Sequence, residues 1–173
     1  MKYVSHISVV LILIITQNLI AQELVGFDDL YINENLIYKV SNDSLFTGIC
    51  ERRRKNGHLV LEETFYKGTI LNANYYYNGK QKIMSDSIIY HPKKPYTYKE
   101  LYRFNLKSQM TEKNSYDTNG KLILVENFEN GKLTYSCQYN GKKKHGKEFC
   151  SSKEGEVLEF EYINGKKVKT KSN

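Results

Sequence analysis

Paired carboxylates are the first groups in this 173-residue sequence that could carry out chemistry. The acidic pairs are Glu62-Glu63, Glu126 with Glu129, and Glu159 with Glu161. Two carboxyls that cleave a glycosidic bond must face one another across the sugar, about 5 to 9.5 Å apart. Near neighbours on one extended segment are explained more simply as charges that keep a strand face soluble. We therefore do not interpret these pairs as a hydrolase site.

Histidine chemistry is equally poorly supported. His58, His91 and His145 stand in or beside predicted turns and have no partners at zinc-site spacing. A nucleophile pair of His145 with Cys150 would need an oriented base and a cleft, which a flat sheet does not readily supply. The sequence also has no phosphate-binding glycine loop, serine elbow or zinc motif. We expect a protein that is not an enzyme, with no catalytic residue, cofactor or metal ion.

Cys137 and Cys150 could form a disulfide. A two-residue turn at Lys143-Lys144 would place them opposite one another on adjacent strands. Cross-strand Cβ atoms lie about 4.5 to 5.5 Å apart, farther than the roughly 3.8 Å of a disulfide, so a bridge needs a close pair. A one-residue shift of the turn would put the sulfurs on opposite faces. The alternative is two buried thiols, and Cys50 is unpaired in either case.

Residues 1–22 have the layout of a secretory signal peptide. Lys2 precedes an apolar run over residues 9–15, and polar residues and then Ala21 follow it. The run is far shorter than the about 20 apolar residues of a membrane-spanning helix. Cleavage near Ala21 or Gln22 would yield an exported protein, periplasmic, envelope-bound or secreted, with no later membrane segment. The alternative is that this run is a buried strand or helix of the domain.

The composition is that of a mildly basic globular chain. It has 26 Lys and Arg against 19 Asp and Glu, 40% hydrophobic residues, 15 Tyr and no Trp. Collagen, coiled coils, polytopic membrane proteins and cysteine-rich mini-scaffolds are excluded. The basic residues gather beside predicted turns and in the tail, at Arg52, Arg53, Arg54, Lys142, Lys143, Lys144 and residues 169–173. Such clusters suit an anionic lipid, glycan or protein of the envelope rather than nucleic acid, and solvated turns are the alternative.

Asn-Gly pairs recur along the chain and predict hairpin turns. Six of the 11 glycines follow an asparagine, and both residues tolerate the positive φ of tight turns. Gly57, Gly68 and Gly79 are evenly spaced, as are Gly120 and Gly131. About seven to nine residues remain for each strand, which suits an antiparallel meander. We predict an all-β fold over residues 23–168, an elongated antiparallel meander of stacked hairpins with little or no helix.

Two segments carry more specific expectations. Leu122 to Val125 is apolar at every position, which predicts a strand covered on both faces. The interval 80–115 lacks glycine and holds both prolines, so residues 91–95 are expected to form an exposed loop. This interval is either a functional loop region or a drifted repeat.

Tyrosine is the most abundant aromatic residue and suits both core and interface positions. Most tyrosines are expected to fill the concave side of the sheet. Those within or next to the interval 80–115 are the candidates for a binding stripe, namely Tyr75, Tyr77, Tyr96, Tyr98 and Tyr102.

Two parts of the sequence resemble a known repeat family. The first runs from Tyr139-Asn140-Gly141-Lys142 through Gly146-Lys147-Glu148-Phe149 to Tyr162-Ile163-Asn164-Gly165-Lys166, and it resembles the MORN-variant repeat. Residues 35–68 are similar to the opening of YwqK-like antitoxins. The resemblance implies a curved antiparallel sheet without enzyme activity, whose surface neutralises a partner toxin. For an exported chain, that toxin would have to act in or arrive through the envelope.

Together these features predict a non-enzymatic exported repeat protein that binds a macromolecular partner through its sheet, as an antitoxin or immunity component. The alternative is an envelope scaffold whose basic turns contact anionic lipid or glycan.

Overall fold

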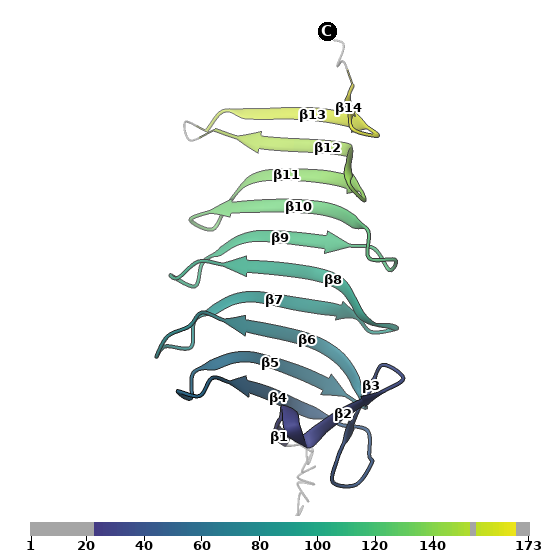
Figure 1. The fold of residues 1–173 in the computed structure, drawn as a ribbon. Helices are drawn as coiled ribbons and strands as arrows, with labels where there is room; N and C mark the ends of the chain where they lie inside the picture. The colour runs from purple at the N-terminus through teal and green to yellow at the C-terminus, as the bar shows by residue number, and fades with distance from the viewer. Residues whose placement is uncertain (1–22, 153–154, 169–173) are drawn as a thin grey trace, which may run out of the picture.

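The computed structural model describes residues 23–152 and 155–168, which form one long sheet (Figure 1). The predicted signal peptide, residues 1–22, and the basic tail, residues 169–173, lie outside the described residues. Twelve strands follow one another in the order β1-β4-β5-β6-β7-β8-β9-β10-β11-β12-β13-β14, and β2 pairs with β3 in a separate hairpin. The predicted all-β meander is therefore confirmed.

The strands of the sheet are β1 (Glu23–Gly26), β4 (Gly48–Arg53), β5 (Leu59–Tyr66), β6 (Thr69–Tyr76), β7 (Met84–His91), β8 (Lys94–Phe104), β9 (Met110–Tyr116), β10 (Leu122–Glu129), β11 (Lys132–Asn140), β12 (Lys143–Ser151), β13 (Val157–Ile163) and β14 (Lys166–Lys167). The separate hairpin consists of β2 (Leu30–Asn33) and β3 (Leu36–Lys39), and one short 3-10 turn, η1 (Phe27–Asp29), precedes it. All neighbours from β4 to β14 are antiparallel, whereas β1 pairs with β4 in parallel, so the sheet is mixed.

Asn-Gly turns close several hairpins as predicted. Asn130 and Gly131 have φ of 51° and 77°, and Asn164 and Gly165 have φ of 51° and 87°. Positive φ at both central residues matches the right-handed twist of the flanking strands.

The proline-containing interval departs from the expected loop. β7 ends at His91 and β8 begins at Lys94, so only Pro92 and Lys93 connect them. The expectation of a loop over 91–95 is wrong because Pro95 lies in a bulge, where the register jumps between the pairs Tyr90↔Tyr98 and His91↔Lys94. A bulge leaves residues outside the ladder, so the missing N–H of proline costs no hydrogen bond there.

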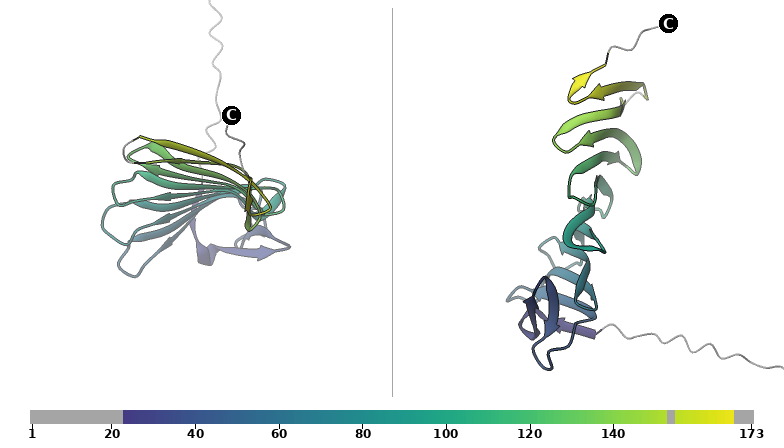
Figure 2. Two further views of the ribbon diagram at one scale, coloured as in Figure 1. Left: turned by 90° about the horizontal axis from the view of Figure 1, so that it is seen from above. Right: turned by 90° about the vertical axis from the view of Figure 1, so that its right-hand side faces the viewer.

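Residues 23–47 form an N-terminal arm, which starts with the edge strand β1 and continues inside the arc of the sheet. Seen from above, the strands curve around it (Figure 2). We call this concave side the hollow face and the opposite side the back face. Main-chain hydrogen bonds tie the arm to the β5–β6 turn: the N–H of Ile37 donates to the Gly68 carbonyl (2.9 Å), and the N–H of Gly68 donates to that of Phe46 (2.7 Å).

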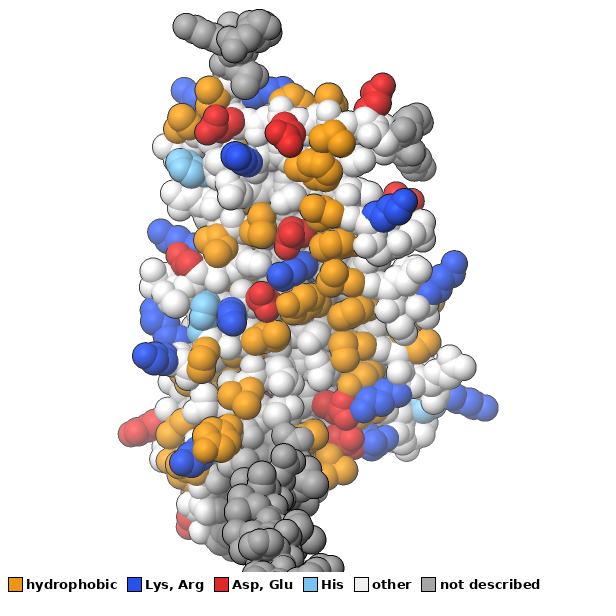
Figure 3. Space-filling model, turned by 180° about the vertical axis from the view of Figure 1, so that it is seen from behind, with side chains coloured by type: hydrophobic (Ala, Val, Ile, Leu, Met, Phe, Trp, Pro, Cys, Tyr) orange, Lys and Arg blue, Asp and Glu red, His pale blue; other side chains and the backbone are white. Residues whose placement is uncertain are grey.

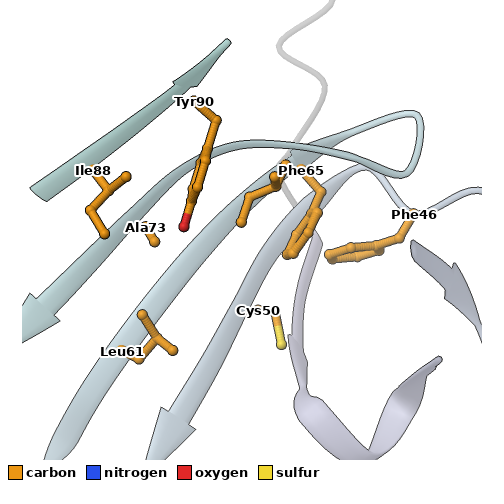
Figure 4. Close-up of a cluster of buried hydrophobic side chains, with 8 residues drawn as sticks. Phe46, Cys50, Leu61, Phe65, Ala73, Ile88 and Tyr90 are labelled. Carbon is orange, nitrogen blue, oxygen red and sulfur yellow. The ribbon is translucent and has the colours of Figure 1, made fainter. Parts of the chain in front are cut away.

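The core lies between the arm and strands β4 to β8. Its buried members are Phe46, Cys50, Leu61, Phe65, Ile70, Ala73, Ile88 and Tyr90, most of which are labelled in Figure 4. Phe46 of the arm packs against Phe65 with ring centroids 5.8 Å apart. The hydrophobic stripe of the sheet is thus buried by the arm, since the described residues contain no α-helix that could cover it.

One cross-strand row runs along the hollow face from β4 to β13. Its members pair in succession and are Cys50, Glu63, Ala73, Ile88, Leu101, Asn114, Val125, Cys137, Glu148 and Phe160.

The prediction that residues 122–125 are covered on both faces is wrong, because Ile123 is 43% exposed. The arm packs against β4 to β8 and so does not cover β10.

Of the two alternatives for Cys137 and Cys150, the disulfide is not formed: all three cysteines are free thiols, with Cys137 buried and Cys150 half-buried. The hairpin turns at Gly141-Lys142, because Asn140 pairs with Lys143. This turn and a bulge between Cys137 and Tyr139 place Tyr135 opposite Cys150. The expected turn at Lys143-Lys144 is wrong, and Cys137 therefore lies opposite Glu148 and not opposite Cys150.

Candidate functional site

Four tyrosines from three strands cluster on the hollow face, and we call Tyr90, Tyr96, Tyr98 and Tyr116 the tyrosine cluster. The ring of Tyr90 meets those of Tyr96 and Tyr98 edge to face, with centroids 6.2 and 5.6 Å apart. Tyr98 meets Tyr116 in the same way at 5.9 Å. Tyr96 and Tyr98 are 39% and 38% exposed, so the cluster has a buried base and a solvent-facing edge.

The end of β7 and the start of β8 position these rings. Tyr90 pairs directly with Tyr98 across the two strands. Tyr96 has φ of 62°, a left-handed conformation that is uncommon for a bulky residue. The bulge at this point allows Tyr96 and Tyr98 to contact the same ring.

His91 links the end of β7 to the turn that follows β9 through hydrogen bonds. Its Nε2 lies 3.0 Å from the carbonyl oxygen of Asp117 and 3.3 Å from that of Tyr116. A carbonyl can only accept, so Nε2 is the donor. His91 therefore acts as a structural link beside the tyrosine cluster.

The structure brings together three of the five tyrosines that the sequence suggested. Tyr96 and Tyr98 are in the cluster, and Tyr75 packs against the nearby core. Tyr102 lies on the back face, where its hydroxyl donates to Glu100 (2.8 Å), and burial together with this bond raises its pKa to about 12. Tyr77 is separate, because its hydroxyl donates to the carbonyl of Phe104 (2.7 Å).

Sequence reasoning missed Tyr90 and Tyr116. Both stand at or next to the last residue of a strand, on the side of the sheet where β8 begins. In an antiparallel meander, the ends of alternate strands meet at one side. That rule could have grouped both residues with Tyr96 and Tyr98.

A pocket of about 270 Å³ lies between the arm and the sheet, next to the tyrosine cluster. We call it the arm pocket. It is lined by Phe27, Leu30, Tyr31, Ile32 and Ile37 of the arm and by Cys50, Glu63, Phe65 and Tyr96 of the sheet. Tyr96 belongs to both the pocket and the cluster, so the two form one continuous surface.

Glu63 is the carboxylate of the arm pocket. Burial raises the pKa of its carboxyl, and the charge of Arg52 opposes this effect. The Arg52 guanidinium stacks on the ring of Phe27, 4.3 Å from its centroid, and forms no ion pair with Glu63. Burial also raises the pKa of the neighbouring Cys50 thiol to about 12, so this thiol is not an activated nucleophile.

The predicted basic residues form two separate groups. Arg52, Arg53 and Arg54 lie at the β4–β5 turn, and Lys142, Lys143 and Lys144 lie at the β11–β12 turn on the other side of the sheet (Figure 1).

Several of these charges are already engaged within the chain. Arg53 forms an ion pair with Glu51 (2.7 Å), and Lys144 forms one with Glu148. Arg54, Lys142 and Lys143 are exposed. The six residues therefore do not make one continuous basic patch.

The back face carries charges within an apolar band. Hydrophobic side chains run along its length with charged ones between them (Figure 3). Lys113 lies between Glu100 (3.5 Å) and Glu126 (3.8 Å). Glu62 pairs with Lys82 at 2.7 Å. Since adjacent strand residues point to opposite faces, Glu62 and Glu63 cannot act on one substrate.

No group of three or more His, Cys, Asp or Glu among the described residues could hold a metal ion. Within the same ranges, no helix has the length and apolar character needed to cross a bilayer.

Comparison with known proteins gives structural neighbours alone. The chain matches no protein-family model and no curated protein. It is similar to a solved structure of a TarM mutant of S. aureus in complex with fondaparinux, alpha-GlcNAc-glycerol and UDP, with a TM-score of 0.40 and 12% identity over 68% of this chain. A GtfA/B complex bound to UDP and GlcNAc has a TM-score of 0.36 and 9% identity over 77% of this chain. This chain spans 21% and 23% of those two chains, and we draw no functional inference from them.

Proposed function

We propose that this chain is a non-enzymatic, exported repeat protein that binds a protein partner through the tyrosine cluster. The exposed edge of the cluster carries this proposal. Tyr96 and Tyr98 are more than one-third exposed, and the buried ring of Tyr90 packs edge to face against both. Rigid aromatic side chains give a large contact area at a low cost in conformational entropy. Tyrosine is accordingly enriched among the residues that dominate binding energies.

The resemblance to MORN-variant repeats and YwqK-like antitoxins supports a neutralising role. The meander of hairpins has the architecture that this resemblance implies. We propose a toxin that acts in or reaches the cell envelope as the partner class, since residues 1–22 read as an export signal.

A second function, contact with anionic lipid or glycan, is favoured by the exposed basic turns. Arg54, Lys142 and Lys143 are exposed. Binding through such charges weakens steeply with salt, because the Debye length falls from about 10 Å at 0.1 M to about 3 Å at 1 M. Contacts made by buried aromatic rings are far less sensitive to salt.

Site-specific crosslinking tests the leading proposal. A photoreactive phenylalanine replaces Tyr98 in one variant and Tyr66 in another, because Tyr66 is 51% exposed but lies at the β5–β6 turn. We expect one protein adduct from position 98 in intact cells and none from position 66. The partner protein in the adduct is identified by mass spectrometry. The purified partner is then titrated against the wild-type chain and the Tyr96→Ala/Tyr98→Ala variant.

The proposal predicts at least a tenfold loss of affinity in the double variant and little change between 0.1 and 0.5 M salt. Unchanged affinity in the double variant overturns it. Loss of binding in Lys142→Gln/Lys143→Gln or at 0.5 M salt, together with binding to vesicles containing phosphatidylglycerol, supports the second function instead.

A further inference from the structure

The arm pocket joins an apolar wall to a single charged group. Leu30, Ile32 and Ile37 supply aliphatic surface, and the rings of Phe27, Tyr31, Phe65 and Tyr96 supply aromatic surface. Glu63 is the acidic residue among the lining residues. Ligand sites commonly have this form, with a mostly apolar lining and few polar groups that orient the ligand.

Glu63 has no partner for its charge among the described residues. Its carboxylate takes part in no hydrogen bond or ion pair there; burial raises its pKa, and the charge of Arg52 lowers it. Glu148, in the same cross-strand row, shows how this sheet satisfies a buried carboxylate: Tyr135 donates to it over 2.9 Å, and Lys144 forms an ion pair with it. The Glu63 carboxylate is therefore available to pair with a cation that enters the pocket.

The other titratable groups near Glu63 cannot supply that cation. Cys50 of β4, Tyr75 of β6, and Tyr90 and Tyr96 near the β7–β8 turn are neutral or anionic in any protonation state. Burial first, and then the charge of Glu63, raise the pKa of the Tyr75 and Tyr96 hydroxyls. Arg52 is the nearby cation, and it is held on Phe27.

Size and chemistry together define the occupant. A volume of about 270 Å³ lies below the usual range of drug-sized sites, roughly 300 to 1,000 Å³, and suits one long side chain. Aromatic faces attract cations, and a carboxylate attracts them further. A lysine side chain matches the site because its apolar stem can line the aliphatic wall while its ammonium reaches Glu63.

We propose that the arm pocket receives a lysine side chain of the partner protein, with the ammonium at Glu63 and the stem between Leu30 and Ile37. This inference rests on the proposed function, because the lysine would enter beside Tyr96, which the pocket shares with the tyrosine cluster. The tyrosine cluster would supply contact area, and the arm pocket would select partners that carry a lysine at the matching position.

A titration without the partner tests the pocket independently. The probes are Nα-acetyl-lysine-N-methylamide and the corresponding norleucine compound, which has the same stem and no charge. Methyl resonances of Leu30, Ile32 and Ile37 are followed by NMR on the purified chain. We expect the lysine probe to shift these resonances and to bind at least tenfold more tightly than the norleucine probe.

Three variants sharpen the test. Glu63→Gln should reduce lysine-probe affinity to the norleucine level, whereas Glu62→Gln, on the back face, should leave it unchanged. Arg52→Gln should increase it, because a competing cation is removed. A dispersed amide spectrum establishes that each variant is folded.

Equal affinity for the two probes, or an unchanged lysine preference in Glu63→Gln, overturns the inference. Either result leaves the crosslinking test at Tyr98 unaffected, so the arm pocket and the tyrosine cluster can fail separately.

Discussion

Glu63 and Glu148 lie in one cross-strand row on the hollow face, on β5 and β12, and they differ in their partners. Glu148 accepts a hydrogen bond from Tyr135 (2.9 Å) and forms an ion pair with Lys144. Glu63 has neither kind of partner among the described residues. The same side chain at equivalent positions should therefore have opposite effects on stability.

Replacing Glu148 should destabilise the fold. Glu148 is 6% exposed, and Glu148→Gln weakens a buried, charge-assisted network at the far end of the sheet from the arm. We expect a loss of about 1 to 3 kcal/mol in the free energy of unfolding, measured by urea denaturation. Glu161→Gln, an exposed change on β13, is the control and should cost less than about 0.5 kcal/mol. Equal effects would show that the Glu148 network contributes nothing to stability.

The contribution of Glu148 should depend on pH in a defined direction. Burial alone would raise the pKa of its carboxyl, but hydrogen bonds from Lys144, Tyr135 and Tyr162 outweigh burial and hold the pKa below its ordinary value. A depressed folded pKa gives stability that is present above the unfolded pKa and is lost as pH falls through the folded pKa. The stability difference between the wild type and Glu148→Gln should therefore shrink below about pH 4. A constant difference between pH 7 and pH 3 would contradict this account.

Replacing Glu63 should have the opposite effect. Its folded pKa is raised, chiefly by burial, so the folded state binds more protons than the unfolded state between the ordinary and the raised value. Stability is then lost as pH rises through that window. Glu63→Gln removes the cost of the charge and should stabilise the chain at pH 7 by about 0.5 to 2 kcal/mol, with no gain at pH 4. Thermal unfolding at the two pH values measures this, and destabilisation at pH 7 would show that Glu63 has an internal partner.

Thiol reactivity should follow the observed register of β11 and β12. Cys50 and Cys137 are buried, whereas Cys150 is half-buried and lies opposite Tyr135. A maleimide added to the folded chain should label Cys150 first, and Cys50 should react only on unfolding because burial raises its pKa to about 12. Mass spectrometry of peptides gives the order of labelling. A Cys137–Cys150 disulfide in the purified chain would overturn the register.

Much of the fold could be predicted from local sequence, because hairpins are local structures. Asn130-Gly131 and Asn164-Gly165 adopt the positive φ that their residue types favour. The position of Cys150 could not be predicted, since a bulge between Cys137 and Tyr139 changes the pairing without any distinctive residue. Bulges of this kind recur along the sheet, and each one limits how far a register can be extrapolated from a turn.

Only part of the candidate site could be predicted from the sequence. Tyr96 and Tyr98 lie in the proline-containing interval 80–115, and this irregularity marked them in the sequence. The arm pocket gave no such signal. It forms because the arm folds back onto strands β4 to β8, and contacts between an irregular segment and a distant strand face leave no periodic pattern.

Gly68 provides a way to test how the arm is held. It has φ of 75°, and a Cβ there would lie 2.7 Å from Cδ2 of Leu45 and 2.9 Å from the carbonyl oxygen of Ile37. Gly131 has φ of 77° with nothing within 4 Å of such a Cβ, so it is a matched control for backbone strain alone. Gly131→Ala should cost about 1 to 2 kcal/mol, the penalty for an L-residue in a left-handed conformation.

Gly68→Ala adds a steric clash with the arm to that penalty and should cost about 1 to 3 kcal/mol more. Because the two main-chain hydrogen bonds between Gly68 and the arm would be strained, proteolysis within residues 23–47 should accelerate in Gly68→Ala and not in Gly131→Ala. The lysine probe should also lose affinity in the first variant, since the arm supplies most of the wall of its pocket. Equal stability and equal cleavage in the two variants would show that the arm is held by side-chain packing alone.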